Sequence, residues 1–243
     1  MTEPATPASI VVGIDGSRAA IRAALWAVDE AVSRDIPVRL CCSIDGDESR
    51  QAAEVSLRQA VTAIQATGAP VKAETDVVRG HAVGSLTRAS ASAAMVCVGA
   101  VGLRHFQPGR VGSTAAALAA SAHCLVAIIR GRDGYQAAGH VAVEVDGPAD
   151  NDELLGVAIE EALLRGADLR VVGVRNLDRR LARWERRYPQ LHVEWGAAPA
   201  PADMVVVDAR NRERIAELIG PVADNSALRE ADCSLLIVNR QHL

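Results

Sequence analysis

The sequence predicts an α/β fold of two tandem, doubly wound parallel-sheet domains, the second of which is shortened. Short β-branched segments alternate with helical segments, and this alternation is typical of parallel sheets. The alternation restarts after residue 139, so the chain carries an internal repeat. We expect the two domains at residues 9–130 and 140–243, with a disordered tail at residues 1–8 and a linker at residues 131–139.

Each element of the first copy follows from local residue types. β-Branched and apolar runs predict strands, alanine-rich amphipathic stretches predict helices, and Asp15-Gly16-Ser17 predicts the turn and cap that start the first helix. Gly68 and Pro70 stop the second helix. The expected strands are residues 9–14, 38–44, 71–78, 95–98 and 125–129, and the expected helices are residues 18–34, 49–67, 82–93 and 113–121.

The second copy repeats three strands of the first. Segments 140–147, 204–208 and 233–238 echo segments 10–16, 95–99 and 124–129, in that order. Where the first copy has its third helix, the second runs from Val193 through a stretch of Gly, Ala and Pro directly into the strand that begins at Met204. We therefore expect one helix to be missing from the second copy.

Composition limits the partners that the chain is expected to bind. It has 26 basic and 30 acidic residues, a formal net charge of −4, and only 2% aromatic residues. A nucleic-acid-binding protein needs a clustered basic face, and single strands need stacking aromatics, so we expect no nucleic-acid partner. No uncharged apolar run reaches ~18 residues, so we expect no membrane partner. The start of the chain lacks the features of a signal peptide. The odd number of cysteines indicates reduced residues in the core. Because of these two observations, we expect a cytoplasmic location.

A glycine-rich segment after the fourth predicted strand carries the chemistry. Gly99 and Gly102 lack Cβ atoms, so a ribose and phosphates can lie against the backbone. The segment 112–114 then opens a helix, whose free N–H groups and positive dipole end favour phosphate oxygens. In a parallel sheet, ligands bind outside the carboxyl ends of the strands, where Asp15 also lies and can accept a hydrogen bond from a ribose hydroxyl.

This segment resembles the motif G-x2-G-x9-G-[ST]-x of the nucleotide-binding members of the universal stress protein family. Its spacing is matched throughout by Gly99, Gly102, Gly112, Ser113 and Thr114. The similarity covers about residues 9–130 well and residues 140–240 weakly.

The resemblance implies a Rossmann-like fold of the adenine nucleotide alpha hydrolase-like type, which binds ATP together with Mg²⁺ or Mn²⁺ carried by the phosphates. It implies that the adenine and ribose are lined by Gly13, Ile14 and Asp15. Ser43 closes the base pocket, where family members have an aliphatic residue. Val98 and the glycine-rich segment complete the implied nucleotide site.

Each of these residues also has a purely structural interpretation. The glycines can serve close packing between strand and helix with no ligand bound, and Asp15 can be only the N-cap of the first helix. Arg104 and Arg110 can assist the phosphates or be solvated loop residues, and His105 lies in the same loop. The arginine-rich helix 179–187 is either a solvated face or a docking site for an anionic partner.

The second copy has lost the motif. The equivalents of Gly99, Gly102 and Gly112-Ser113-Thr114 are Asp208, Asn211 and Gly220-Pro221-Val222. An acidic side chain repels phosphate, and Pro221 has no backbone N–H to donate. We predict that the second copy binds no nucleotide and that Asp146 is a cap or turn residue there.

Three functions fit these observations. The first is an ATP-binding regulatory protein of the stress response that acts on an unidentified protein partner. The second is a slow hydrolase of ATP or an adenylate; Lys72 is the only lysine and no P-loop is present, so strong neutralisation of phosphate charge is lacking. The third is a nucleotide-free scaffold. The resemblance further implies that strands 125–129 and 235–238 pair, which gives an internal pseudo-dimer, with a homodimer as a further option.

Overall fold

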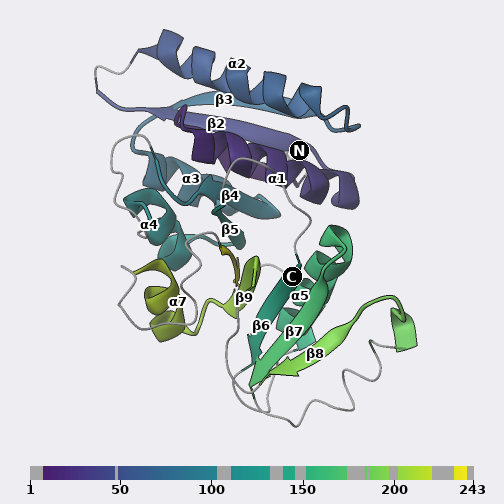
Figure 1. The fold of residues 1–243 in the computed structure, drawn as a ribbon. Helices are drawn as coiled ribbons and strands as arrows, with labels where there is room; N and C mark the ends of the chain where they lie inside the picture. Colours follow the sequence, from purple (N-terminus) through teal and green to yellow (C-terminus); the bar gives the residue numbers. More distant parts are fainter. Residues whose placement is uncertain are drawn as a thin grey trace, which may run out of the picture.

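A computed structural model describes residues 8–46, 49–102, 111–131, 139–145, 152–173, 184, 186–196, 202–220 and 233–239. Their strands form one ten-stranded sheet in the order β3-β2-β1-β4-β5-β10-β9-β6-β7-β8 (Figure 1). Its strands are β1 (Ile10–Gly13), β2 (Val38–Ile44), β3 (Ala73–Arg79), β4 (Met95–Gly99), β5 (Leu125–Ile129), β6 (His140–Val145), β7 (Asp168–Gly173), β8 (Val193–Gly196), β9 (Met204–Asp208) and β10 (Ser234–Val238).

Every neighbouring pair of strands is parallel except β5 and β10, which pair antiparallel with Leu236 opposite Ala127. The predicted α/β fold with doubly wound parallel sheets is confirmed, and the pairing of the two fifth strands fuses both halves into one sheet. The order β3-β2-β1-β4-β5 of the first half is matched by β8-β7-β6-β9-β10 in the second. The two halves are therefore related by a pseudo-twofold axis that passes between β5 and β10.

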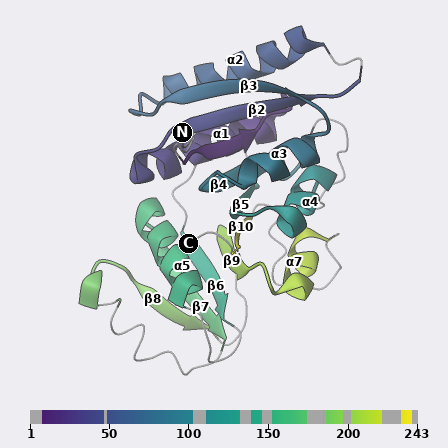
Figure 2. The same ribbon diagram turned by 180° about the vertical axis from the view of Figure 1, so that it is seen from behind.

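Helices cover both faces of this sheet (Figures 1 and 2). One hydrophobic core lies under α1 (Arg18–Arg34), α2 (Arg50–Ala66) and α5 (Asp152–Arg165). The other lies under α3 (Ala82–Ser90), α4 (Ser113–Ser121) and α7 (Arg212–Ile219). Each core contains residues from both halves, such as Ile10 with Val141 in the first and Val11 with Ala142 in the second. Burial thus continues across the junction between the halves.

The expected helix 18–34 is α1, and its cap lies within the predicted turn Asp15-Gly16-Ser17. Ser17 is the N-cap, because its side chain accepts a hydrogen bond from the Ala20 N–H at 3.0 Å. Asp15 is therefore not the cap. Its Oδ1 instead accepts from the Ser17 N–H at 2.9 Å and holds the turn that precedes the helix.

The connection that contains α3 in the first half is shorter in the second half. Residues 80–94 connect β3 to β4 and contain α3, which packs on β1 and β2, whereas residues 197–203 connect β8 to β9. Of this shorter connection only Ala202 and Asp203 are described, and neither is helical. A connection of this length is too short for a helix as long as α3, in agreement with the expected loss.

The expected reduced cysteines are confirmed, since all five are free and buried. Within the described part of the chain, no helix is both long and apolar enough to cross a membrane. Of the expected basic helix 179–187, only Trp184, Arg186 and Arg187 are described, and they are helical. Most of the expected linker and tail lies outside the described residues.

Candidate functional site

The candidate site lies at the carboxyl ends of β1 and β4. β1 is flanked by β2 on one side and by β4 on the other, so the winding of the chain reverses between β1 and β4. Such a reversal leaves a crevice at the carboxyl edge of a parallel sheet, which is where ligands bind in doubly wound folds. Gly13 is the last residue of β1, and Gly99 is the last residue of β4.

Asp15 and Gly102 meet at this edge although they are distant in sequence. Asp15 is exposed, and its Oδ2 lies 2.7 Å from the point that a Cβ on Gly102 would occupy. A side chain at position 102 would therefore collide with the carboxylate. The absence of a side chain at Gly102 lets the acceptor oxygen of Asp15 lie directly against the backbone that follows β4.

Gly112 closes the glycine-rich segment beside these residues. Its N–H donates to the Ala100 carbonyl oxygen at 2.7 Å, and a Cβ on Gly112 would lie 3.7 Å from the Gly102 backbone nitrogen. Gly112 is the N-cap of α4, and no side chain caps the first turn of this helix. Ser113 is exposed and Thr114 is half-buried. The positive end of the α4 dipole thus lies at the edge that Asp15 and Gly102 form.

Gly99 has a packing role. A Cβ on Gly99 would lie 2.5 Å from the carbonyl carbon of Ala19, which is backbone of α1 and cannot rotate away. Close approach of α1 to β4 therefore requires a glycine at position 99, whether or not a ligand binds at this edge. Gly13 is similarly close to its neighbours, because a Cβ there would lie 3.0 Å from Leu86 and 3.1 Å from Val98.

The remaining predicted residues lie nearby in different settings. Ile14 and Val98 are both 4% exposed, so their side chains belong to the core. Ser43 is half-buried near the end of β2, two residues beyond Cys41, which pairs with Gly13. It therefore lies at the same edge of the sheet. The predicted Arg104, His105 and Arg110 fall outside the described residues.

Comparison with known proteins identifies the family. Residues 8–130 match the sequence model of the universal stress protein family. Universal stress protein Rv2028c of Mycobacterium tuberculosis is 44% identical over 284 aligned positions that cover 100% of both chains. The chain belongs to the universal stress protein family. Universal stress protein Rv2624c of the same organism is 38% identical over 266 positions, which cover 97% of each chain.

The fold agrees with this membership. The crystal structure of a universal stress protein from Archaeoglobus fulgidus superposes with a TM-score of 0.70 at 15% sequence identity and covers 96% of each chain. At this identity the likeness concerns the fold alone. It extends over both halves of the chain, beyond the 8–130 segment that the family model matches.

The second half of this universal stress protein has a different carboxyl edge. Asp208 ends β9 and binds Arg210, whose Nη2 lies 2.9 Å from Asp208 Oδ2. Asn211 caps α7 by accepting from the Arg214 N–H at 3.1 Å. Gly220 ends α7 as its C-cap, whereas Gly112 begins α4. The segment after Gly220, which the repeat aligns with the start of α4, lies outside the described residues.

An ion pair occupies the position in the second half that is equivalent to Gly13. Val141 pairs with Leu169 and Met204 as Ile10 pairs with Val38 and Met95, so Glu144 is the equivalent of Gly13. Arg214 of α7 binds the Glu144 carboxylate through Nε at 2.6 Å and Nη2 at 2.5 Å. The second edge is thus occupied by side chains of the protein itself.

A buried charge cluster joins the halves and was not predicted from the sequence. Arg165 of α5 binds Asp29 at 3.0 Å and also pairs with Glu30, both of which belong to α1. Its guanidinium lies 4.2 Å from the ring centroid of Trp26, and its Nη2 lies 3.5 Å from Glu161. The side chains of Arg165, Glu30 and Glu161 are at most 2% exposed.

The sequence did contain a signal for this cluster. Both α1 and α5 end on the pattern E-A-x-x-R, at Glu30–Arg34 and Glu161–Arg165. Spacing of four residues places each Glu and Arg on one face of its helix. Burial, together with the charge of Glu30, raises the pKa of Glu161 to about 8.

Proposed function

We propose that this universal stress protein is a regulatory protein that binds one ATP at the carboxyl edge of β1 and β4. The observation that carries the proposal is the approach of Asp15 to Gly102 beside the uncapped start of α4. An anionic acceptor for a ribose hydroxyl thus lies next to a helix N-terminus, which favours phosphate. The two chemical demands of a nucleotide are met within one crevice.

The proposed binding mode divides the predicted residues between two parts of the ligand. Asp15 accepts from the ribose, and Gly13, Ile14 and Ser43 surround the base from the ends of β1 and β2. The backbone of Gly102 and Gly112 and the hydroxyl groups of Ser113 and Thr114 bind the phosphates, with Val98 and Gly99 beneath them. Mg²⁺ or Mn²⁺ is carried by the phosphates and neutralises part of their charge, so no lysine is needed for this purpose.

Regulation is proposed to run through the contact between the nucleotide edge and the second half. The N–H of Val111, the neighbour of Gly112, lies 3.5 Å from the Ile219 carbonyl oxygen at the end of α7. Arg130, which follows β5, donates to the Leu218 carbonyl oxygen at 2.8 Å. A phosphate that orders the start of α4 therefore acts on residues that also contact α7, and this supports a nucleotide-dependent surface for a protein partner.

The decisive experiment is isothermal titration of ATP into the full chain and into a variant of the first helical turn. Ser113→Asp places a carboxylate at the start of α4, which the helix dipole tolerates but phosphate does not. We expect about one ATP per wild-type chain and loss of binding in Ser113→Asp. Ser92→Asp is the control, because Ser92 is an exposed serine shortly before β4 begins and therefore lies at the opposite edge of the sheet.

Two results would overturn the proposal. One is ATP binding that survives Ser113→Asp unchanged. The other is a melting temperature that does not respond to millimolar ATP, since a ligand that binds only the native state must stabilise it. That second outcome would assign the chain to the nucleotide-free scaffolds. A phosphate-release assay on the same samples is expected to give slow or absent turnover.

A further inference from the structure

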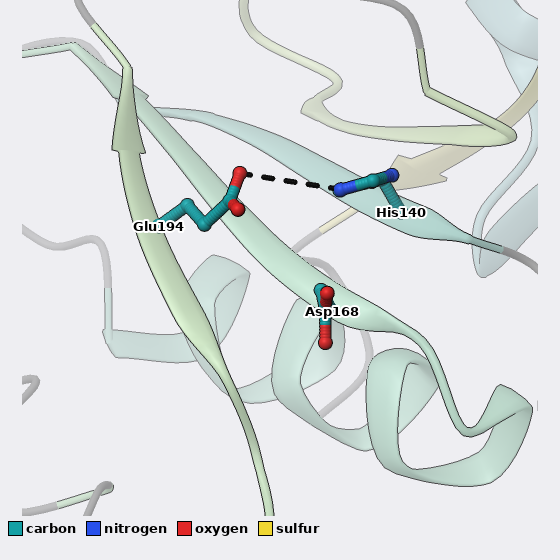
Figure 3. Close-up of side chains that lie close together, drawn as sticks. All are labelled: His140, Asp168 and Glu194. Carbon is teal, nitrogen blue, oxygen red and sulfur yellow. Dashed lines mark ion pairs between the residues drawn. The ribbon is translucent and has the colours of Figure 1, made fainter.

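Three side chains converge on the second half of the sheet, away from the nucleotide edge of the first half. His140 begins β6, Asp168 begins β7, and Glu194 lies in β8 (Figure 3). One possible ligand atom from each of them lies within 4.8 Å of the others, and all three side chains are half-buried. His140 Nε2 is 4.0 Å from Glu194 Oε2. Imidazole and carboxylate groups are the protein ligands of first-row divalent metal ions.

A second histidine extends the cluster. His192 lies two residues before Glu194, and its Nε2 is 3.7 Å from Glu194 Oε1. The two oxygens of this carboxylate are thus approached by different imidazoles. The set of two histidines and two carboxylates matches the number of ligands that a four-coordinate ion needs.

Neighbouring residues fix one ligand side chain and the backbone of two others. Arg170 donates to Glu194 Oε2 through Nη2 at 2.8 Å and Nε at 3.3 Å, and so orients the carboxylate from one side. Such support of a ligand side chain by a neighbouring hydrogen bond is typical of metal sites. The backbone N–H of His140 donates to Asp203 at 3.0 Å and that of Asp168 to the Gly139 carbonyl oxygen at 3.2 Å, which places the starts of β6 and β7.

We propose that His140, Asp168, His192 and Glu194 bind a divalent transition-metal ion, with Zn²⁺ as the best match to two imidazoles and two carboxylates. Ligand atoms around a four-coordinate Zn²⁺ lie about 3.5 Å apart, because each is about 2.0–2.2 Å from the ion. The ligand atoms of His140, Asp168 and Glu194 lie within 4.8 Å of one another, which exceeds this by at most about 1.3 Å, and the His192–Glu194 distance of 3.7 Å exceeds it by about 0.2 Å. Rotation of half-exposed side chains on fixed strands suffices to close these gaps.

The first half provides an internal comparison. The register of Ile10, Val38 and Ala73 matches that of Val141, Leu169 and Val193. The equivalents of His140, Asp168, His192 and Glu194 are therefore Ser9, Pro37, Lys72 and Glu74. Only the glutamate is shared, and a lysine replaces one of the histidines. The ligand set is thus a property of the second half and does not come with the repeated fold.

The proposed metal site is separate from the proposed nucleotide site. Three strands, β5, β10 and β9, lie between β4 and β6 in the sheet. Metal binding is therefore expected in Ser113→Asp, the variant that removes ATP binding. Failure of one proposal leaves the other unaffected.

The experiment uses the untagged full chain after treatment with a chelator. Titration with Zn²⁺ is expected to show about one ion per chain, and Co²⁺ is expected to give visible absorption bands of a low-coordinate site with nitrogen and oxygen ligands. Loss of a ligand should weaken Zn²⁺ binding about tenfold or more in His140→Ala and in Glu194→Gln. The control is His81→Ala, because His81 is an exposed histidine that pairs with Asp45 in the first half.

Glu194→Gln keeps the shape of the side chain and tests the site even where His140→Ala unfolds the protein. Circular dichroism of each variant separates loss of binding from loss of fold. Equal Zn²⁺ affinity in wild type and both variants would overturn the proposal, as would absence of binding to the folded wild type. A Co²⁺ spectrum with thiolate charge-transfer bands would also overturn it, since the ion would then be held by the cysteines.

Discussion

The two halves of this universal stress protein share one strand order and differ at the carboxyl edge of the sheet. In the first half the edge is built from glycines, and the carboxylate of Asp15 lies against Gly102. In the second half, Glu144 and Arg214 fill the corresponding space. The residues that follow also differ, since Gly112 precedes Ser113 at the start of α4, whereas Gly220 precedes Pro221. The repeated strand order therefore does not fix the chemistry of this edge, which depends on where side chains are absent.

The junction between the halves is also asymmetric, because equivalent residues of the two halves form different ion pairs. Glu30–Arg34 and Glu161–Arg165 occupy equivalent positions at the ends of α1 and α5. Arg34 is 25% exposed and pairs with Glu30 of its own helix, whereas Arg165 is 2% exposed and crosses to the other half. Arg165 therefore forms an ionic link between the halves, whereas its equivalent Arg34 pairs within its own helix.

Substitution of Arg165 is expected to give the largest effect. Arg165→Leu leaves buried carboxylates on both helices without their shared cation and removes the contact with Trp26. Removing one partner of a buried ion pair costs about 3–5 kcal/mol. Chemical denaturation should therefore show a large loss of stability for Arg165→Leu and a much smaller one for Arg34→Leu. Equal losses in the two variants would mean that the junction is as symmetric as the fold.

Glu161 should make stability depend on pH. Burial and the charge of Glu30 raise its pKa to about 8, whereas an unfolded chain gives a glutamate a pKa of about 4.3. The folded state binds the proton more tightly, so the stabilisation is fully present below about pH 4, falls as the pH rises and is lost above about pH 8. A tenfold change in proton affinity corresponds to about 1.4 kcal/mol, which makes the total change a few kcal/mol.

Glu161→Gln removes this proton equilibrium. Denaturation curves measured from about pH 5 to pH 8 should flatten in Glu161→Gln, and the variant should gain stability relative to wild type as the pH rises. Glu160→Gln is the control, because Glu160 is the neighbouring residue and is exposed. This substitution should leave the pH slope of the wild-type stability intact. An unchanged slope in Glu161→Gln would show that this glutamate is ionised in the folded protein.

The glycines of the first half can be separated by their structural cost. Gly99→Ala brings a Cβ within 2.5 Å of the α1 backbone, and overpacking of this kind costs about 1–3 kcal/mol. In Gly112→Ala the new Cβ comes no closer than 3.5 Å to its neighbours. Alanine stabilises the protein by stiffening the unfolded chain and destabilises it because it is a weaker N-cap than glycine. These two effects roughly cancel, so the free energy of unfolding should stay within about 0.5 kcal/mol of wild type. Thermal denaturation of the two variants tests this difference; equal melting temperatures would contradict the packing role of Gly99.

Local patterns in the sequence predicted the elements well where periodicity was strong. The expected helix 18–34 and strand 38–44 have the observed bounds. The third helix ends earlier than expected, at Ser90, whose hydroxyl donates to the Thr87 carbonyl and accepts from the His123 N–H. That second bond depends on a residue 33 positions away, which no local pattern contains.

The candidate site was predicted only in part, because some of its contacts join residues that are distant in the sequence. Spacing identified the glycines, but the collision that requires Gly99 involves α1 and becomes visible only in three dimensions. The buried cluster at Arg165 depends on α1 and α5 sharing one face of the sheet, which follows from the antiparallel pairing of β5 with β10. Helix α7 is not among the elements expected from the sequence, although Asn211 is a good N-cap residue.

The smallest effect is expected from opening the carboxyl edge of the second half. Arg214→Ala breaks a pair whose side chains are about 15% exposed and should cost about 1–2 kcal/mol. Adding Glu144→Gly and Asp208→Gly restores the residue types of the first half at the equivalent positions. Calorimetry should still give about one ATP per chain, because Pro221 stands where the first half has Ser113 and has neither a backbone N–H nor a hydroxyl to donate. Two ATP per triple variant would mean that the side chains of Glu144, Asp208 and Arg214, and not the loss of these donors, keep the second half from binding nucleotide.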